Sequence, residues 1–499
     1  MLSAFVEDAA HFPGGHADAV ATPGSEAAVA RILRESAHVL PIGAQSSLTG
    51  GATPMGGVLL STARLNRVLE IGADFVRVEA GVTLTELDAA LCAAGKYYPP
   101  VPTFTGAFVG GIVATNAAGA ATFKHGTTRD WVRALTVVLP SGDVLDVERR
   151  AVRAHGDGYF DIELREGARR VPVPRYRMPC VPKLSAGYYA ASSMDLVDLL
   201  VGSEGTLGVV TEVTLGVIPE RPALCLAFVT LDDRRRAMAL VDELRRRSGE
   251  VMVSAIEHMD GRCLALLRED GADRQFGVKL AETAAIALLI TLELPPATSA
   301  AQAFDEIGRF GELETPLARF CRVLDRAGVL EDVEVAVPGD QARAGQLLGL
   351  REAVPAAVNA RVGRAKQTVD PRIAKTAADM IVPFDRLEEL MRFYDDEFAR
   401  RRLDAAVWGH ISDGNLHPNV IPRSLADVES GKEAIRAFGR EVVRMGGAPL
   451  AEHGVGRNPI KQELLRDLYG PEGLEQMRAV KRAFDPEWKL SPGVIFERL

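Results

Sequence analysis

The chain has 499 residues, 47% of them hydrophobic, and a formal net charge of -9 at neutral pH. This length suggests two or three domains with cores of ordinary size, and the acidic balance gives no support to nucleic-acid binding. The N-terminus has neither a basic start nor a long apolar stretch, and the longest apolar run, 284–290, is far shorter than the ~20 residues that cross a bilayer, so we expect a soluble, cytoplasmic protein without a transmembrane segment.

The first 220 residues predict short strands and helices separated by turns. Ser25 is the expected N-cap of an amphipathic helix over 25–36, and Gly95 the expected stop of a helix over 83–94. A charged, proline-bearing stretch over 149–182 is interpreted as an irregular excursion. The other predicted elements are strands over 58–61, 68–71, 76–79, 132–139, 144–147 and 212–218, and a helix over 195–201.

Three Gly-rich segments interrupt these elements. A strand at 38–42 runs into residues 43–51, whose consecutive N–H groups can form an anion-binding nest, although an ordinary tight turn explains them equally well. Residues 99–130 carry only three basic side chains and one acidic one among many glycines and alanines. Such small residues suggest backbone packed against something large, flat and buried; the alternative is close packing of a helix on a sheet. The third segment, 202–210, leads into a strand.

From Leu224 the pattern changes to alternating strands and helices, after a proline-bearing boundary at 219–222. Alternating split βαβ units are typical of an antiparallel sheet with helices on one face. Residues 357–375, with five basic side chains, are expected to be mobile or to line a site. The predicted strands cover 224–231, 251–256, 283–294, 333–337 and 380–383, and the predicted helices cover 233–247, 261–268, 299–310, 340–356, 384–401 and 430–445, before a final helical stretch.

The segment 408–418 carries the strongest functional signal. Its Asp413-Gly414 dipeptide is typical of a two-residue hairpin turn, because both turn positions tolerate positive φ. His410 would then face His417 with Cβ atoms about 5 Å apart, close enough for both rings to reach one metal ion or one substrate oxygen. The other predicted pairs are Ser412 with Asn415 and Ile411 with Leu416, and the latter two would point into a core.

Glu452, in the segment 451–456, is available as a third ligand. Two histidines, one glutamate and an open position suit a catalytic Zn²⁺ or a similar ion. The alternative is a cross-strand pair of polar histidines and an unrelated surface glutamate. Three of the nine histidines fall in these two short Gly-rich segments, which favours the site.

Cysteines and arginine clusters suggest no further site. The cysteines are odd in number and widely spaced, so a disulfide framework or a thiolate metal site is not expected. The Arg clusters at 234–236 and 245–247 alternate with acidic residues, which indicates a solvated helix face, with a polyanion site as the alternative. We expect all five cysteines to be reduced packing residues: Cys92, Cys180, Cys225, Cys263 and Cys321.

The order of these motifs resembles the FAD-linked oxidase family. The resemblance is to the FAD-binding fold of vanillyl-alcohol oxidase and p-cresol methylhydroxylase, in the D-lactate, D-2-hydroxyglutarate and glycolate dehydrogenase branch. One Gly-rich loop alone is a weak signal, whereas GSEGTLG, GHxxDGNLH and EHGVG in this order are specific. The matching segments cover nearly the whole chain: 43–51, 99–130, 202–210, 410–417, 452–453 and 491–496.

The resemblance implies an α+β fold in three segments. Residues 1–220 would form a two-part FAD-binding domain of the p-cresol methylhydroxylase type, and 221–448 an α+β cap whose antiparallel sheet is built from ferredoxin-like units. Residues 449–499 would return to the FAD-binding domain. The residues expected to hold FAD are Gly43, Ala44, Gln45, Ser46, Ser47, Leu48, Pro99, Thr105, Gly106, Gly110, Gly111, Ala114, Asn116, Gly119, Glu204, Gly205, Gly208 and Val209.

The resemblance also implies roles for individual residues. A divalent metal, Zn²⁺ or Mn²⁺, would be bound by His410, His417 and Glu452. Arg351 would hold the substrate carboxylate together with Lys375, although the spacing between these two is longer than expected for the family. The alternative for Arg351 is an ion pair with Glu352 or another acid. The remaining implied catalytic residues are His453, as general base, and Asn415.

Three positions depart from the family pattern. Gln45-Ser46 stand where covalent relatives have a histidine, so noncovalent FAD is expected. The usual Arg-Gly-Gly-Gly opening of this loop is Ile42-Gly-Ala-Gln45 here, which alters the expected pyrophosphate contacts. Ser491 replaces the common asparagine before the final Pro-Gly, which removes one expected flavin contact.

The implied activity is FAD-dependent oxidation of a 2-hydroxy acid, expected to be the D enantiomer, to the 2-oxo acid. Metal-assisted deprotonation of the hydroxyl would accompany hydride transfer to flavin N5. Quinone, cytochrome, electron-transfer flavoprotein and oxygen all stay open as electron acceptors, as does a homodimer. The alternatives are a flavin-dependent alcohol oxidase of another substrate class, a flavin-binding subunit of a larger oxidoreductase complex, and a flavin-free metallohydrolase, which would leave the Gly-rich half unexplained.

Overall fold

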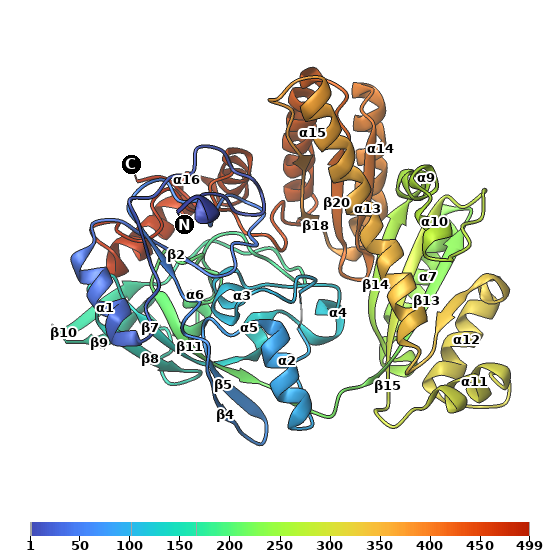
Figure 1. Ribbon diagram of the computed structural model, residues 1–499, viewed down its shortest axis with the longest axis horizontal. Coiled ribbons are helices and arrows are strands. Elements are labelled where there is room, and N and C mark those ends of the chain that lie inside the picture. Colours follow the sequence, from blue (N-terminus) through green and yellow to red (C-terminus); the bar gives the residue numbers. More distant parts are fainter. Residues whose placement is uncertain (1, 101, 166, 499) are drawn as a thin grey trace. The chain divides into compact units, whose positions relative to one another are not determined.

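A computed structural model describes residues 2–100, 102–165 and 167–498 (Figure 1). The chain divides into a first unit, Met1–Gly119, Gly126–Glu220 and Ala448–Leu499, and a second unit, Ala120–His125 and Arg221–Gly447. The C-terminal segment thus belongs to the same unit as the N-terminal part of the chain. Within the described ranges, no helix combines the length and the apolar composition that crossing a bilayer requires.

The first unit is built on two main sheets. The parallel sheet has the strand order β1 (Ala19–Ala21), β3 (Val58–Ser61), β2 (Val39–Ile42). The antiparallel sheet has the order β4 (Val68–Ile71), β5 (Phe75–Glu79), β11 (Val209–Gly216), β7 (Val132–Val138), β8 (Val144–Glu148). Along β8, Leu145 and Val147 are buried while their neighbours are exposed, so one face of this strand packs on the core.

Several helices of the first unit begin at residues whose side chains cap them. Ser25 accepts a hydrogen bond from the Ala28 N–H at the start of α1 (Glu26–Glu35), as predicted. Thr83 forms a capping box with Glu86 at the start of α2 (Leu84–Ala93). The small-residue segment 99–130 forms α3 (Val109–Thr115) and α5 (Thr128–Trp131) in the first unit, and α4 (Thr122–His125), which belongs to the second unit. Helix α6 (Leu196–Leu200) of the first unit follows later.

The stretch 149–182 is not irregular throughout, so that prediction was wrong in part. It contains the antiparallel hairpin of β9 (Tyr159–Leu164) and β10 (Gly167–Pro172). Phe160 and Ile162 on β9 are buried and alternate with exposed residues. This short alternation identifies a strand, although the surrounding charged residues and prolines obscure it.

The C-terminal segment contributes to the core of the first unit. Helix α16 (Pro459–Phe484) breaks at Gly470, whose φ of 70° is not helical, directly before Pro471. Met477, Phe484 and Phe496 pack in the same hydrophobic cluster as residues of β5, β7 and α3. The last part of the chain is therefore part of the hydrophobic core of the first unit.

The second unit contains an eight-stranded antiparallel sheet. Its strand order is β16 (Glu334–Ala336), β13 (Ala223–Leu231), β15 (Ile286–Leu294), β14 (Val253–Asp260), β19 (Ala405–His410), β20 (Asn415–Val420), β17 (Thr376–Ala377), and β18 (Met380–Ile381) also pairs with β20. The predicted α+β class with an antiparallel sheet is confirmed.

Helices cover both faces of this sheet, so the expectation of helices on one face was wrong. Leu226 and Leu289 pack with α9 (Gly261–Asp270) and α13 (Gln341–Thr368). Ala227 and Ile290 point to the other face and are equally buried, and α7 (Arg234–Arg246) packs against the same strands. Continuous burial along β13 and β15 follows from this double cover.

The remaining helices of the second unit correct two predictions. Residues 357–368, expected to be mobile or site-lining, continue α13 to Thr368. Helix α12 (Pro316–Arg326), which opens with Thr315 as its N-cap, was not predicted at all. The other helices are α8 (Ser248–Val251), α10 (Ala272–Gln275), α11 (Ala300–Gly308), α14 (Leu387–Arg401) and α15 (Leu425–Arg444), of which α14 and α15 lie side by side (Figure 1).

The five cysteines, all in the described part of the chain, are free. Cys225, Cys263 and Cys321 are buried, as a packing role requires, and burial raises the pKa of the Cys225 thiol to about 12. Cys92 and Cys180 are exposed. The predicted packing role was therefore wrong for these two residues.

Candidate active site

The turn between β19 and β20 is longer than predicted. Residues Ile411–Asp413 form a 3-10 turn, and His410 pairs with Asn415 rather than with His417, which pairs with Trp408. The two-residue hairpin and its register were therefore wrong. Gly414 has a φ of 82°, and a Cβ there would lie 2.3 Å from the Val382 carbonyl oxygen, so the turn needs glycine at this position.

His410 and His417 nevertheless lie on the same face of the sheet. His417 follows Asn415, the partner of His410, by two residues, so the two histidines are diagonal neighbours. Their ring centroids are 5.6 Å apart and the ring planes are nearly perpendicular, at 89°. Both side chains are buried. The register differs from the prediction, yet the structure does bring the two imidazoles together.

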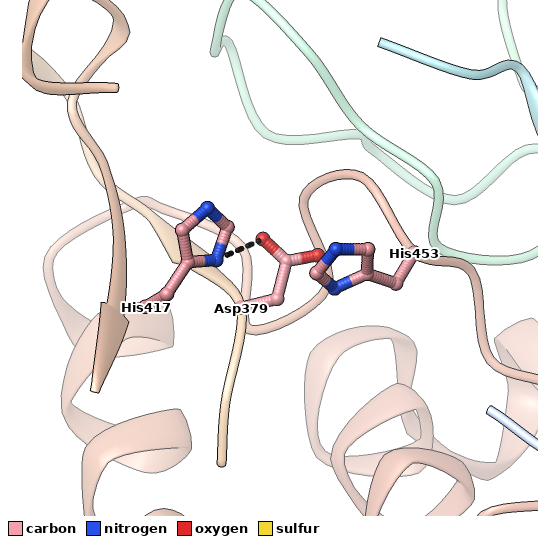
Figure 2. Close-up of side chains that lie close together, drawn as sticks. All are labelled: Asp379, His417 and His453. Atoms are coloured by element: carbon pink, nitrogen blue, oxygen red, sulfur yellow. Dashed lines mark ion pairs between the residues drawn. The ribbon is translucent and has the colours of Figure 1, made fainter. Parts of the chain in front are cut away.

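Each histidine faces a carboxylate through Nδ1. Glu257, on β14, places Oε2 4.0 Å from Nδ1 of His410. Asp379, between β17 and β18, places Oδ1 3.5 Å from Nδ1 of His417, and Figure 2 shows this ion pair. Metal-binding histidines in proteins usually direct their second ring nitrogen at a carboxylate or carbonyl. This orientation leaves Nε2 of each ring as the ligand atom, so the pair fits a metal site chemically.

The same carboxylates bind two further predicted residues. Glu257 accepts a hydrogen bond from Nε of Arg351, whose Nη1 donates to Glu352 at 2.7 Å. The ion pair considered as the alternative role of Arg351 is therefore present. It uses two of the five N–H groups of the guanidinium, so it does not exclude a ligand. Burial opposes the charge of Arg351, but Glu257 and Glu352 outweigh it and raise the guanidinium pKa above its usual value.

Asn415 is held in the same way by Asp379. Its Nδ2 donates to Oδ1 of Asp379 at 3.0 Å and to the carbonyl of Met380 at 2.9 Å. Its Oδ1 is buried, and no hydrogen-bond partner for it exists among the described residues. A buried amide oxygen without a donor is a candidate for contact with a bound ligand.

Lys375 lies directly before β17 in the second unit. Its side chain is exposed, yet the surrounding protein removes enough water to lower the pKa of its ammonium. This desolvation therefore disfavours the charged form of the ammonium, and an approaching anion would favour it again. This environment suits the predicted contact with a carboxylate.

Glu452 and His453 belong to the first unit, whereas His410, His417 and Arg351 belong to the second. The ligand set of two histidines and Glu452 stays a prediction. Within its own unit, the buried Glu452 carboxylate binds the ammonium of Lys183, whose side chain is 0% exposed. Sequence reasoning missed Lys183, because a single lysine among small residues carries no recognisable motif.

The loop that carries Glu452 and His453 is fixed by Glu204. The Glu204 carboxylate accepts hydrogen bonds of 2.8 Å from the N–H groups of Val455 and Gly456. Burial raises the pKa of Glu204, while these two N–H groups lower it. Glu204 was predicted to contact FAD. That contact stays a prediction, and the two hydrogen bonds give Glu204 a second role in supporting the backbone of residues 454–456.

The predicted FAD-binding glycines fall into two classes. A Cβ on Gly110 would lie 2.7 Å from Cβ of Ala80, and a Cβ on Gly208 would lie 2.3 Å from Cγ1 of Val137. These glycines allow close packing of the protein on itself, which for Gly110 is the alternative that the sequence left open for residues 99–130. By contrast, apart from its chain neighbours and the backbone of its own helix, no heavy atom of the described residues lies within 4 Å of a Cβ built on Gly111. Its small size is not explained by internal packing.

Comparisons with known proteins identify the family. Residues 221–495 match the model described as FAD linked oxidases, C-terminal domain, and residues 17–148 match the FAD binding domain. The chain belongs to the FAD-linked oxidases. A D-lactate dehydrogenase of Anaerostipes hadrus is 29% identical over 95% of this chain and 87% of its own length. The glycolate oxidase subunit GlcD of Bacillus subtilis is 27% identical, over 96% and 89%.

One further relative and one solved structure are similar to this FAD-linked oxidase. A D-2-hydroxyglutarate dehydrogenase of Xanthomonas citri pv. viticola is 29% identical over 96% of this chain and 89% of its own length. Among solved structures, an alkyldihydroxyacetonephosphate synthase is 16% identical and matches with a TM-score of 0.59, over 95% of this chain and 75% of that one. This structural likeness supports the fold alone.

The first unit of this FAD-linked oxidase has surfaces that suit FAD. Leu48, in the loop after β2, is 47% exposed, and Phe104 is 56% exposed. Large exposed apolar side chains are typical of a ligand-binding surface. Gln45 uses its side-chain amide to donate to the carbonyls of Phe5 and Ala52, at 2.9 and 2.8 Å. The position that holds a covalent histidine in some family members therefore supports the loop here.

Proposed function

We propose that this FAD-linked oxidase oxidises a D-2-hydroxy acid to the corresponding 2-oxo acid. The relatives named above are a D-lactate dehydrogenase, a glycolate oxidase subunit and a D-2-hydroxyglutarate dehydrogenase. Their substrates share a carboxylate next to a carbon that bears a hydroxyl. The observation that carries the proposal is the buried His410 and His417 pair, joined through Glu257 to the guanidinium of Arg351.

Bound FAD would supply the hydride acceptor for the oxidation at the substrate Cα. The loop residues 43–48 and the helix start at Gly110–Gly111 would hold it, together with residues 204–209. Noncovalent binding is supported by Gln45, whose side chain is engaged by two carbonyls. Leu48 and the open position at Gly111 offer the apolar contact and the room that a ring system requires.

A divalent metal, Zn²⁺ or Mn²⁺, would be held by His410, His417 and Glu452, and it would supply Lewis-acid polarisation of the substrate hydroxyl. The carboxylates facing Nδ1 of both histidines support this assignment, because they favour the tautomer that carries its proton on Nδ1 and not on Nε2. The ammonium of Lys183 binds the Glu452 carboxylate and would hold it in place for the metal.

The other residues bind and orient the substrate. His453 would accept the hydroxyl proton, a task that suits an imidazole near neutral pH. Arg351 and Lys375 would hold the carboxylate and thereby determine which face of Cα is presented. Asn415 would accept a hydrogen bond from the substrate through its otherwise unpaired Oδ1.

Anaerobic stopped-flow spectroscopy tests the proposal. The purified flavoprotein is mixed with D- and L-lactate, glycolate and D-2-hydroxyglutarate, and bleaching of the flavin band is followed with and without a chelator. We expect one D acid or glycolate to bleach the flavin, and chelation to slow bleaching at least tenfold. An unbleached flavin with every acid would favour another alcohol substrate or a flavin-binding subunit. A protein without flavin bands would favour a metallohydrolase.

A further inference from the structure

Glu257 lies directly opposite His410 in the sheet of the second unit. The register of β14 on β19 pairs these two residues, so both side chains leave the sheet on the same face. The Glu257 side chain is 14% exposed. The backbone pairing alone therefore fixes a nearly buried carboxylate beside one histidine of the pair.

One oxygen of Glu257 faces two site residues at once. Oε2 accepts the hydrogen bond from Nε of Arg351, and the same atom lies 4.0 Å from Nδ1 of His410. Arg351 comes from α13 and His410 from the end of β19, so the carboxylate connects two elements that are far apart in the chain. Glu352 also binds Arg351, at 2.7 Å, but its side chain is half exposed.

We infer that Glu257 is a positioning residue that holds the predicted carboxylate-binding arginine and one predicted metal ligand in a single arrangement. This inference rests on the proposed function and assigns to Glu257 a role that the sequence motifs did not suggest. Glu257 fixes the plane of the Arg351 guanidinium, which leaves its other N–H groups for a substrate carboxylate. It also orients the His410 ring so that Nε2 is the ligand atom.

This shared contact connects the two functions of the site. A substrate carboxylate on the remaining N–H groups of Arg351 shares the charge of the guanidinium with Glu257. The Glu257 carboxylate can then interact more strongly with Nδ1 of His410, which strengthens Nε2 as a metal ligand. Because binding free energies are reciprocal, metal and substrate are each expected to tighten the binding of the other through Glu257.

Mn²⁺ binding to the metal-free flavoprotein tests the inference without measuring turnover. Free Mn²⁺ is quantified by electron paramagnetic resonance during a titration of the wild type, Glu257→Gln and Glu352→Gln. Both variants remove one anionic partner of Arg351, but only Glu257 faces His410. We expect Glu257→Gln to weaken Mn²⁺ binding about 10- to 100-fold, and Glu352→Gln to stay within about twofold of the wild type.

Flavin content and the midpoint of thermal unfolding show whether each variant is folded. If Glu257→Gln does not yield a folded flavoprotein, Glu257→Asp replaces it, because the shorter side chain keeps the charge and withdraws it from His410. About threefold or greater weakening is expected for Glu257→Asp. Mn²⁺ affinity equal to that of the wild type, in the glutamine variant or in its replacement, would overturn the inference, as would equal weakening by Glu257→Gln and Glu352→Gln.

Failure of the proposed function gives a different result. A wild-type flavoprotein that binds neither Mn²⁺ nor Zn²⁺ overturns both the metal site and the role of Glu257. A wild type that binds Mn²⁺ in a Glu257-dependent manner, but whose flavin is not bleached by any 2-hydroxy acid, contradicts only the proposed substrate class.

Discussion

The guanidinium of Arg245 donates a hydrogen bond of 2.8 Å to the main-chain carbonyl of Ser412, two residues after His410. The same guanidinium lies over the ring of Phe384, 3.7 Å from its centroid. From the other side, the Ser412 hydroxyl accepts a hydrogen bond from the N–H of Ile256 at 3.2 Å. The turn that follows His410 is thus held by α7 and β14. Arg245 was expected on a solvated helix face, and that expectation was wrong for this arginine.

Replacing Arg245 by Met is expected to lower the free energy of unfolding by about 1.5–3 kcal/mol, because a charged hydrogen bond and a cation–π contact are lost together. Arg246→Met is the matched control. Arg246 is exposed and pairs with Asp242 at 2.9 Å on the same helix, so its loss should cost less than about 0.5 kcal/mol. Urea unfolding measures both values, and equal effects would show that the turn does not depend on Arg245.

Lys183 gives a second prediction. Lys183→Met leaves the buried Glu452 carboxylate without its ammonium partner, and about 3–5 kcal/mol of stability should be lost. The double variant Lys183→Met with Glu452→Gln removes both charges and should recover at least half of that loss. Chemical denaturation of the single and double variants gives the coupling free energy. A double variant no more stable than Lys183→Met would mean that the ion pair is not the cause.

Most elements could be predicted from periodicity, but the register of the hairpin could not. Asp413-Gly414 favours a two-residue turn when only neighbouring residues are considered. In the folded chain, contacts from Arg245 and Ile256 hold Ser412 and stabilise a longer turn. These partners are distant in the sequence, so no local pattern reports them. The two histidines stayed on one face because the actual pairing moved His410 opposite Asn415, two positions from His417.

The carboxylates of the site were missed for a related reason. Glu257 and Asp379 are single acidic residues in or beside strands, and neither belongs to a motif. Their importance depends on which strand pairs with which: Glu257 meets His410 only through the pairing of β14 with β19. Histidines and glycines could be singled out from the sequence because their residue type is unusual in context. The residues that position them are of common types, so they can be recognised only once the fold is known.

The glycines of α3 distinguish packing from ligand binding. Gly110→Ala is expected to destabilise the protein by about 1–3 kcal/mol, because its Cβ would lie 2.7 Å from Cβ of Ala80 and 3.1 Å from the Ala80 carbonyl oxygen. Outside its own helix backbone and its chain neighbours, the methyl group of Gly111→Ala meets no described atom within 4 Å, so the flavin-free protein should be equally stable or gain up to about 1 kcal/mol of helix propensity. Thermal unfolding of the flavin-free variants checks both statements.

FAD binding should be weakened more by Gly111→Ala than by Gly110→Ala, which is the opposite of the order expected for stability. Gly111→Ala is expected to weaken FAD binding at least about tenfold, since a methyl group would occupy space that the ligand needs. The main effect of Gly110→Ala should be a lower free energy of unfolding and not weaker FAD binding. Reconstitution followed by flavin fluorescence measures the dissociation constants. Unchanged FAD affinity in Gly111→Ala would remove Gly111 from the binding surface.

His258 predicts how stability depends on pH. Burial, and to a smaller extent the charge of Arg234, lowers the pKa of His258 to about 3. Neither ring nitrogen has a hydrogen-bond partner in the described part of the chain. In the unfolded chain the imidazole would have a pKa of about 6.5, so the unfolded state binds more protons between these two values. Stability from the neutral ring is therefore complete above about pH 6.5 and is lost as the pH falls towards about 3.

Between pH 7.5 and pH 5.0 this single group should remove about 2 kcal/mol from the free energy of unfolding. His258→Leu keeps a buried apolar side chain and cannot be protonated, so its stability should fall by about 2 kcal/mol less over the same interval. Urea unfolding of the wild type and the variant at both pH values measures the difference. Parallel pH dependences in the two proteins would mean that His258 takes up its proton without unfolding, and that the buried ring finds a partner when charged.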